Sequence, residues 1–181
     1  MSTTRLFILG VIRFSEPVHG YDIKRELESW HVEEWAHVAY GSIYHALKAL
    51  TKDGLIEPVD TGQVGRRPAR TTYRITVAGE REFQRLLREH WWSVQVPKDP
   101  FMAALSFMPD LPREELLGAL RRRLELGRAA VKEWSVAMTT KELADAPRHV
   151  GELFLLMTAR TEAEIGWLEN LIRKVEAGAM P

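Results

Sequence analysis

The chain is organised around residues 39–56, Ala-Tyr-Gly-Ser-Ile-Tyr-His-Ala-Leu-Lys-Ala-Leu-Thr-Lys-Asp-Gly-Leu-Ile. Ile43, Leu47 and Leu50 follow one another at i, i+4 and i+7, which places them on one face of a short helix. Gly54 stands where a helix that ends in a left-handed residue needs glycine, and the apolar pair after it suits a strand. The stretch therefore predicts a helix that stops abruptly and continues into a strand.

The opposite face of this predicted helix is polar and basic. It carries Ser42, Tyr44, His45, Lys48 and Lys52. None of these side chains requires burial, and all of them can form hydrogen bonds or neutralise phosphate. A DNA-recognition helix needs an apolar face that packs against its domain and a polar face that points outward. An ordinary amphipathic surface helix shows the same pattern, so the rest of the chain must discriminate between the two.

Composition excludes several classes of protein. The 181 residues include no cysteine, which excludes disulfide bonds, thiol catalysis and cysteine-ligated zinc. Hydrophobic residues make up 45% of the chain, enough for a sizeable core. The sequence shows neither a secretion signal nor an apolar run of the roughly 18 residues that a membrane span needs, so we expect a cytoplasmic protein. Acidic and basic residues balance at 25 each, so any affinity for nucleic acid must come from a local patch.

Two further helices are expected before the quoted stretch. Residues 4–14 are mostly apolar, and Ser15-Glu16-Pro17 closes them at a length that is long for a strand. Residues 18–30 carry an apolar stripe at i, i+4 and i+7 and predict a second helix. Residues 31–39 are open between an extension of that helix and a loop.

A β-hairpin is expected after the quoted stretch. Residues 55–60 and 70–75 read as two strands, the second of which is rich in β-branched and aromatic residues. Residues 61–69 between them contain glycine and proline and read as the hairpin loop. Thr76 is placed to cap the next helix, which we predict over residues 77–92.

Prolines 97, 100, 109 and 112 interrupt the pattern and indicate a boundary between a domain of residues 1–96 and one of residues 97–181. After a short apolar helix at 101–108, two long helices are expected, with apolar seams that run from Leu116 to Met138 and from Val150 to Val175. The fold class is therefore mainly α-helical with a small β-wing, and the two long helices should form an antiparallel hairpin. Two helices cannot by themselves bury two wide apolar faces, so a second copy of the chain would complete the domain and form a homodimer.

Three motifs resemble one known family. Residues 20–27 read Gly-Tyr-Asp-Ile-Lys-Arg-Glu-Leu, residues 41–56 belong to the stretch quoted above, and residues 65–79 read Gly-Arg-Arg-Pro-Ala-Arg-Thr-Thr-Tyr-Arg-Ile-Thr-Val-Ala-Gly. Together with the order of three helices, strand, basic loop, strand and helix, they resemble the PadR family of bacterial transcriptional regulators. Residues 98–177 are similar in pattern and length to the helical C-terminal dimerisation domain of the longer family members.

The resemblance implies a winged helix-turn-helix fold and a homodimer that binds a double-stranded DNA operator and usually represses transcription. The helix of the quoted stretch would enter the major groove, and the hairpin would lie along the backbone or the minor groove. Tyr44 matches the family's recognition-helix tyrosine, which is expected to contact phosphate, and Gly54 matches its turn glycine. Tyr73 and Gly79 match a Tyr-x-Leu-Thr-x-x-Gly pattern, with Ile75 in place of leucine.

Two positions depart from the family pattern. His45 stands where many members have proline or arginine, which bears on the base preference of the recognition helix. Arg67 is an additional residue in the Gly-Arg-Pro order of the wing, which adds charge and leaves the register of the wing open.

A local basic patch accompanies these motifs. Residues 41–75 contain six basic and three acidic residues, a balance of +3 within a neutral chain. Because each neutralised phosphate releases counterions, this patch would supply most of the affinity for DNA, while Ser42, His45 and Lys48 are the best candidates to read base edges. The arginines of the wing would contact the backbone, and the alternative for them is a solvated loop. The expected DNA contacts are Ser42, Tyr44, His45, Lys48, Arg66, Arg67, Arg70 and Tyr73.

Six tryptophans are many for a chain of this length. Aromatic residues at helical spacing usually belong to a core or a dimer interface. The functional alternative is a flat apolar pocket that stacks a small aromatic effector, and the resemblance favours it because some family members bind planar ligands between subunits. The candidate effector-binding residues are Trp91, Trp92, Trp134 and Trp167.

The remaining patterns carry no catalytic or metal site. His31 and His37 lie six residues apart, which is off one helical face and differs from the His-Glu-x-x-His motif. We find no phosphate-binding loop and no nucleophile motif, so we expect neither an enzyme nor a cofactor. A winged domain that binds protein instead of DNA is the alternative function, but such a domain has no need of Arg66, Arg67 and Arg70.

Overall fold

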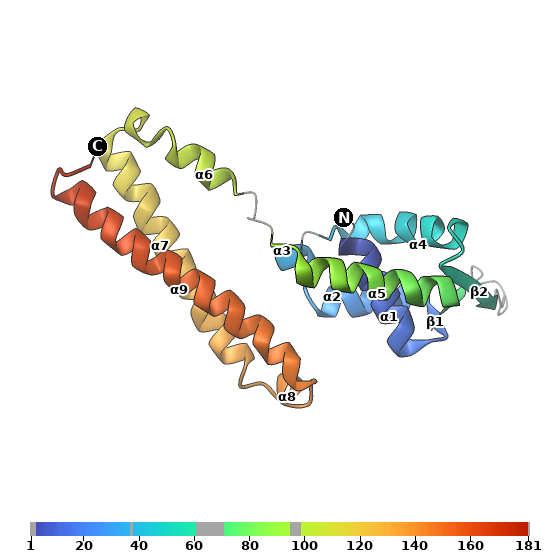
Figure 1. The fold of residues 1–181 in the computed structure, drawn as a ribbon. Helices are drawn as coiled ribbons and strands as arrows, with labels where there is room; N and C mark the ends of the chain where they lie inside the picture. The colour runs from blue at the N-terminus through green and yellow to red at the C-terminus, as the bar shows by residue number, and fades with distance from the viewer. Residues whose placement is uncertain (1–2, 37, 61–70, 95–98, 181) are drawn as a thin grey trace, which may run out of the picture. The chain divides into compact units, whose positions relative to one another are not determined.

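The computed structural model describes residues 3–180 except 37, 61–70 and 95–98. These residues form two compact units, Met1–Val96 and Pro97–Pro181, and each unit is described by itself. Figure 1 shows both as ribbons. Among the described residues, no helix has the length and the apolar composition that crossing a membrane requires.

The first unit contains helices and a three-stranded sheet. Its elements are α1 (Thr3–Ser15), β1 (Val18–His19), α2 (Gly20–Ser29), α3 (Val32–Ala36), the 3-10 turn η1 (Tyr40–Ser42), α4 (Ile43–Lys52), β2 (Ile56–Asp60), β3 (Thr72–Ile75) and α5 (Val77–Trp92). The sheet is antiparallel in the order β1-β3-β2, with Val18 opposite Tyr73 and Ile56 opposite Ile75. The predicted helices at 4–14, within the stretch 39–56 and at 77–92, together with both predicted strands, are confirmed within a few residues.

Two expectations for the first unit need correction. The predicted helix at 18–30 begins only at Gly20, because Val18 and His19 form a short strand that pairs with β3. Residues 31–39, which the sequence left open, contain the separate helix α3. His31 precedes it with φ 52° and ends the path of α2, so α3 is not an extension of that helix.

Helix α1 lies at the centre of the first unit. It packs against α2, α4, α5 and β3, and this explains why its sequence is apolar on more than one side. Ile8, Leu9, Val11 and Ile12 are almost fully buried there. An ion pair of 2.9 Å between Arg13 and Glu80 joins the outer end of α1 to α5. The core residues shared by these helices and the sheet include Ile23, Leu27, Val32, Val38, Ile43, Leu47, Leu50, Ile56 and Leu86.

A network of hydrogen bonds joins the end of α4 to the start of α5. The Thr76 hydroxyl accepts from the Gly79 N–H at 3.0 Å, as the predicted helix cap requires. The same hydroxyl lies 2.8 Å from the Gly54 carbonyl, to which it donates, and the Thr76 N–H donates to the Leu55 carbonyl at 3.1 Å. This hydrogen-bond network fixes the turn after α4 against the first turn of α5.

Removing the Thr76 hydroxyl should weaken this hydrogen-bond network. We expect Thr76→Ala to lower the free energy of unfolding by about 1–2 kcal/mol, the usual loss for an N-cap residue, in a urea titration of the full-length protein. Thr76→Ser keeps a hydroxyl at the same position and serves as the matched control. Equal stability of the alanine and serine variants would contradict a capping role.

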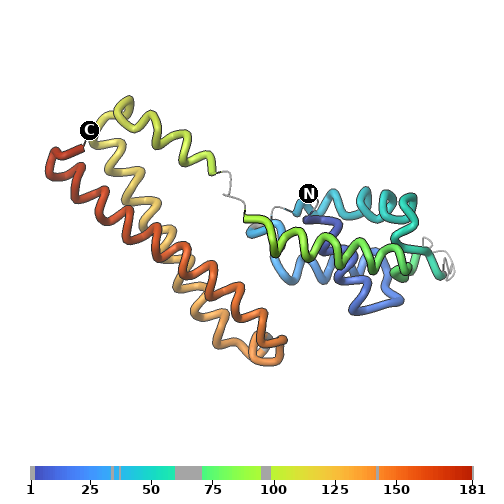
Figure 2. Tube along the Cα trace, in the orientation of Figure 1, coloured from blue at the N-terminus to red at the C-terminus, as the bar shows by residue number. Residues whose placement is uncertain are grey.

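The second unit is a long helical hairpin with short helices at its ends. Its elements are α6 (Pro100–Leu105), the 3-10 turn η2 (Met108–Asp110), α7 (Arg113–Ala137), α8 (Lys141–Ala144) and α9 (Arg148–Glu176). Helices α7 and α9 lie side by side and run antiparallel, as predicted (Figures 1 and 2). The predicted apolar helix at 101–108 is shorter than expected, because it ends at Leu105 and Met108 begins η2.

Among the described residues, the fully buried side chains of the hairpin gather at one of its ends. Its buried side chains are Met108, Leu116, Leu117, Leu120, Leu168, Leu171, Ile172 and Val175, all near the end where α7 begins and α9 finishes. Toward α8 the predicted seams are only partly covered: Val131, Trp134 and Phe154 are half-buried, Leu153 is 42% exposed and Met138 is 39% exposed. Large apolar side chains outside the predicted seams, among them Val136, Leu155 and Leu156, are also exposed there. The expectation that two helices leave apolar surface uncovered holds for this end of the hairpin.

Candidate nucleic-acid interface

Helix α4 presents one apolar and one polar face, as the sequence predicts. Ile43, Leu47 and Leu50 are at most 1% exposed and hold the helix on the core. On the other side His45 and Lys48 are exposed, and 46% of Tyr44 is accessible to solvent. The structure therefore brings three of the predicted contact residues together on one outward face.

Ser42 occupies a different position from these three residues. It lies in η1, directly before α4, and it is only half-exposed. Its hydroxyl donates to the Ala39 carbonyl at 2.7 Å, so its single proton is already used within the turn. Ser42 can still accept a hydrogen bond, which restricts the base groups that it could read to donors.

The end of α4 is fixed by its own backbone. Gly54 has φ 68°, the left-handed conformation predicted for it, and its N–H donates to the Thr51 carbonyl at 3.0 Å. The Leu55 N–H donates to the Leu50 carbonyl at 2.9 Å. An exposed ion pair of 2.8 Å between Arg5 and Asp53 adds a weak link to α1. These contacts set the direction of α4, so its outward face has a defined orientation on the first unit.

The wing is described only in its strands. Arg66, Arg67 and Arg70 lie outside the described residues, so their predicted contacts stay predictions. Tyr73 lies on β3, where it is half-buried and packs against the core cluster. Its neighbour Arg74 is exposed. The structure thus gives Tyr73 a packing role beside any contact with DNA, and it places Arg74, one of the six basic residues of the predicted patch, at the surface.

Helix α2 contributes two residues that the sequence analysis missed. Tyr21 is 61% exposed, and Lys24 follows it by one turn on the same face. The contact between α2 and α4 explains how they join the site: a methyl group added at Gly20 would lie 3.8 Å from the Tyr44 ring and 3.4 Å from the Tyr73 ring. An aromatic and a basic residue one turn apart, opposite the buried Ile23, were the signal that could have identified them.

Neighbouring groups favour the charged form of the Lys24 side chain. A hydrogen bond to Glu28 and the charge of that carboxylate raise the pKa of the Lys24 ammonium, and desolvation opposes them. Tyr44 and Tyr21 contribute further small increases to the same pKa. The pairing of Lys24 with Glu28 at 3.0 Å competes with phosphate for the same ammonium group.

Three cations on this side of the unit are not neutralised. Lys48 and Lys52 of α4 and Arg74 of β3 form no ion pair with any residue that the structure describes. Exposed cations without local partners are available to phosphate groups, whose counterions they release on binding. Within the described part of residues 41–75 these three cations are equal in number to the carboxylates of Asp53, Glu57 and Asp60, so the predicted excess of +3 depends on the three arginines that lie outside the described residues.

The four candidate effector tryptophans do not form one group within a unit. Trp91 and Trp92 end α5 in the first unit and are 80% and 87% exposed. Trp134 lies half-buried on α7, and Trp167 lies on α9 with its ring 6.0 Å from that of Phe101. Within residues 3–180 apart from the gaps named above, no group of three or more metal-ligating side chains is found.

Comparisons with known proteins agree on one family. The model of the transcriptional regulator PadR-like family matches residues 8–85. Over 183 residues the chain is 26% identical to the negative transcriptional regulator PadR of Bacillus subtilis (strain 168), covering 97% of this chain and 99% of that protein. The resemblance stated from the sequence motifs is thereby confirmed.

The structure is similar to two crystal structures of the Bacillus subtilis protein. For PadR in complex with operator DNA, the TM-score is 0.76 at 24% identity, with 96% of this chain and 99% of that chain covered. For PadR in complex with p-coumaric acid, the TM-score is 0.76 at 21% identity, with 97% and 99% covered. This likeness confirms the mainly helical winged fold over nearly the whole chain.

Proposed function

We propose that the chain, whose residues 8–85 match the model of the PadR-like family of transcriptional regulators, is a homodimeric repressor that binds operator DNA and responds to a small-molecule effector. The observation that carries the proposal is helix α4, whose apolar face is anchored in the core while Tyr44, His45 and Lys48 face outward. A fixed helix with an exposed polar face fits the width of the major groove.

The relatives supply the direction of regulation. The similar Bacillus subtilis protein is a negative regulator, and its structures include complexes with operator DNA and with p-coumaric acid. We carry repression and effector control to this chain as parts of the proposal. A regulator of this kind works in the compartment that holds the chromosome, so we place it in the cytoplasm.

The helical hairpin supports the dimeric part of the proposal. Its α8 end exposes Val136, Leu153, Leu155 and Leu156 at 42–59%. Exposed apolar side chains at this end of the hairpin support an interaction surface there. A second copy of the same hairpin offers an equal apolar surface, and a two-fold pair would also place two α4 helices on two half-sites of one operator.

Substitutions on α4 and in the wing should separate the reading of bases from the holding of the backbone. We expect Lys48→Ala or His45→Ala to cost about 1–3 kcal/mol of binding on the operator and little on unrelated DNA, if the side chain reads a base. We expect the double variant Arg66→Ala/Arg67→Ala to weaken both kinds of DNA alike. It should also reduce the salt slope by about one for each phosphate that a subunit no longer neutralises.

Fluorescence anisotropy on two labelled duplexes tests both expectations. The operator is first selected from random duplexes with the purified protein, and a scrambled duplex of the same composition is the second probe. Lys141→Ala, an exposed substitution in the second unit, is the matched control and should leave both affinities unchanged. If the wing variant binds both duplexes as tightly as the unmodified protein at every salt concentration, the proposed docking is wrong.

A further inference from the structure

An open cavity of about 260 Å³ lies at the surface of the second unit, between the segment α6–η2 and the C-terminal part of α9. Most of its lining is apolar and comes from Leu105, Met108, Trp167, Leu171 and Met180. Two polar side chains, Asn170 and Lys174, complete it. Every lining residue belongs to the second unit, so the cavity does not depend on how the two units are arranged.

The polar residues of the cavity are grouped on one side. Asn170 and Lys174 are four residues apart on α9, which places them next to each other on one helical face. Neither side chain has a hydrogen-bond or ion-pair partner among the described residues. Arg121, Arg123 and Arg128 of this hairpin are each paired with a carboxylate. Lys174 shares its lack of a described partner with other cations, such as Lys132 and Lys141, but those two do not line the cavity. Lys174 is therefore an available positive charge at the rim of an apolar cavity.

The lining defines the chemistry of an occupant. Apolar side chains and the Trp167 indole favour a compact apolar body, either aliphatic or a single ring. The Lys174 ammonium and the Asn170 amide can both donate hydrogen bonds to one carboxylate, and charge-assisted bonds of this kind are stronger than neutral ones. A second charged group on the occupant would have no partner in this lining.

We propose that this cavity binds a small apolar monocarboxylate, which Lys174 and Asn170 hold by its charged end while Trp167 packs against its body. As a regulatory site, the cavity rests on the proposed function, but its ligand binding does not. The assignment separates Trp167 from the other tryptophans that the sequence grouped with it, because Trp91, Trp92 and Trp134 do not line this cavity.

Trp167 links the cavity to the start of the second unit. Its ring meets the Phe101 ring edge to face at 6.0 Å and 81°, and the Arg123 guanidinium lies 3.8 Å over the Phe101 ring. Arg123 also pairs with Glu164 and, at 3.5 Å, with Asp99, whose carboxylate caps α6. A ligand that packs on Trp167 thus stabilises the docked position of α6. It shifts DNA binding to the extent that it prefers one arrangement of this segment.

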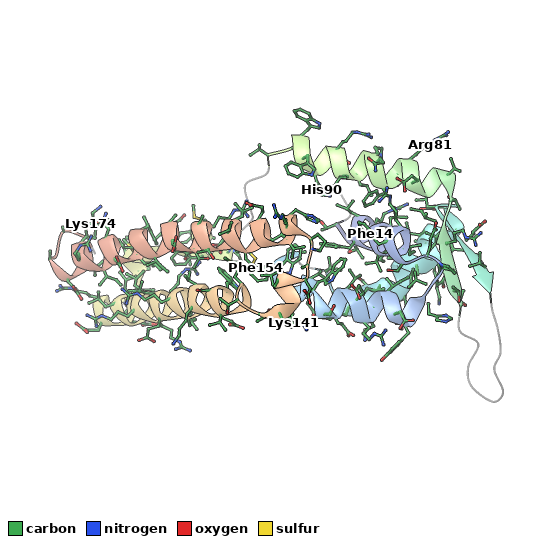
Figure 3. The ribbon with its side chains drawn as sticks, turned by 90° about the horizontal axis from the view of Figure 1, so that it is seen from below. Phe14, Arg81, His90, Lys141, Phe154 and Lys174 are labelled. Atoms are coloured by element: carbon green, nitrogen blue, oxygen red, sulfur yellow. The ribbon has the colours of Figure 1, made fainter. Side chains whose placement is uncertain are left out.

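Binding is tested on the full-length protein without DNA, by titration calorimetry with 4-phenylbutyrate and octanoate. The neutral amide 4-phenylbutyramide is the matched ligand. We expect each carboxylate to bind at least about tenfold more tightly than the amide, and Lys174→Gln to remove that difference. Lys141→Gln, which lies at the opposite end of the hairpin (Figure 3), should change nothing. The carboxylates should also shift the methyl resonances of Met108 and Met180 and slow amide exchange in α6.

Several results would overturn the proposal. Equal affinity for carboxylate and amide, unchanged binding by Lys174→Gln, or methyl shifts that spare Met108 and Met180 would each show that the cavity is not a carboxylate site. Operator binding is then measured with and without the carboxylate. If the ligand binds as described and operator affinity is unchanged, the regulatory role is overturned and the site stands. If no carboxylate binds while operator binding is normal, the cavity proposal fails and the proposed function is untouched.

Discussion

Gly79→Ala is expected to destabilise the first unit by at least about 3 kcal/mol, the upper end of the penalties for overpacking. A methyl group at this position would lie 1.9 Å from the Leu55 carbonyl oxygen and 2.8 Å from Ile75 Cγ1. The first of these atoms is backbone, and the Thr76 N–H holds it by a hydrogen bond, so it cannot move aside cheaply. The added methyl group would force α5 away from the turn that ends α4.

Thermal unfolding of the full-length protein measures this effect. For a unit of this size we expect the midpoint of its transition to fall by roughly 12 °C or more. Gly41→Ala is the matched control, because a methyl group there meets nothing within 4 Å and the backbone has no positive φ. A Gly79→Ala protein that unfolds together with the Gly41→Ala protein would show that α5 does not press on the Leu55 carbonyl.

Removing the second unit should have the largest effect on DNA binding. We expect a chain that ends at Gln95 to fold, to remain monomeric, and to bind the operator about 10²–10⁴-fold more weakly than the full chain. The reason is that a dimer engages two half-sites at once, whereas an isolated winged domain engages one. Affinity for a single half-site should be nearly the same for both proteins, because α4 and the wing are unchanged.

Sedimentation and anisotropy measurements test this prediction together. The full chain should sediment as a dimer at micromolar concentration, and the shortened chain as a monomer. A cooperative thermal transition in the shortened chain is the control for its folding. We expect the shortened chain to fold because Trp91 and Trp92, at the end of α5, are already solvent-exposed in the full chain and lose no cover when the second unit is removed. A full chain that sediments as a monomer, or a shortened chain that binds the operator as tightly as the full one, would exclude the dimeric repressor.

The candidate site was predictable where it depends on one helix. The spacing of Ile43, Leu47 and Leu50 was sufficient to assign the two faces of α4, because a helix that packs on a core must bury one side. The same kind of spacing places Tyr21 and Lys24 on the outer face of α2, but it does not show that this face lies beside α4. Their place in the site depends on the packing of α2 against α4 around Gly20, a contact between residues that are distant in sequence.

Local elements and the resemblance to the PadR-like family were readable from the amino-acid order alone. Gly54 and Thr76 act as predicted because helix ends obey rules that involve only a few neighbouring residues. The long helices α7 and α9 were predictable because an apolar period repeated over many turns has one structural interpretation. The motifs in residues 20–79 added the winged fold, since they identify a family.

Features that depend on distant partners became visible only in the folded chain. A two-residue strand such as β1 has no periodicity, so its pairing with β3 is visible only once the sheet is formed. The need for glycine at position 79 arises from the Leu55 carbonyl, which another part of the chain places there. The apolar seam of the hairpin is continuous in sequence, yet its side chains are fully buried only where η2 and the two long helices meet. Burial is a property of the packed chain, because each side chain is covered by residues that its own sequence neighbours do not specify.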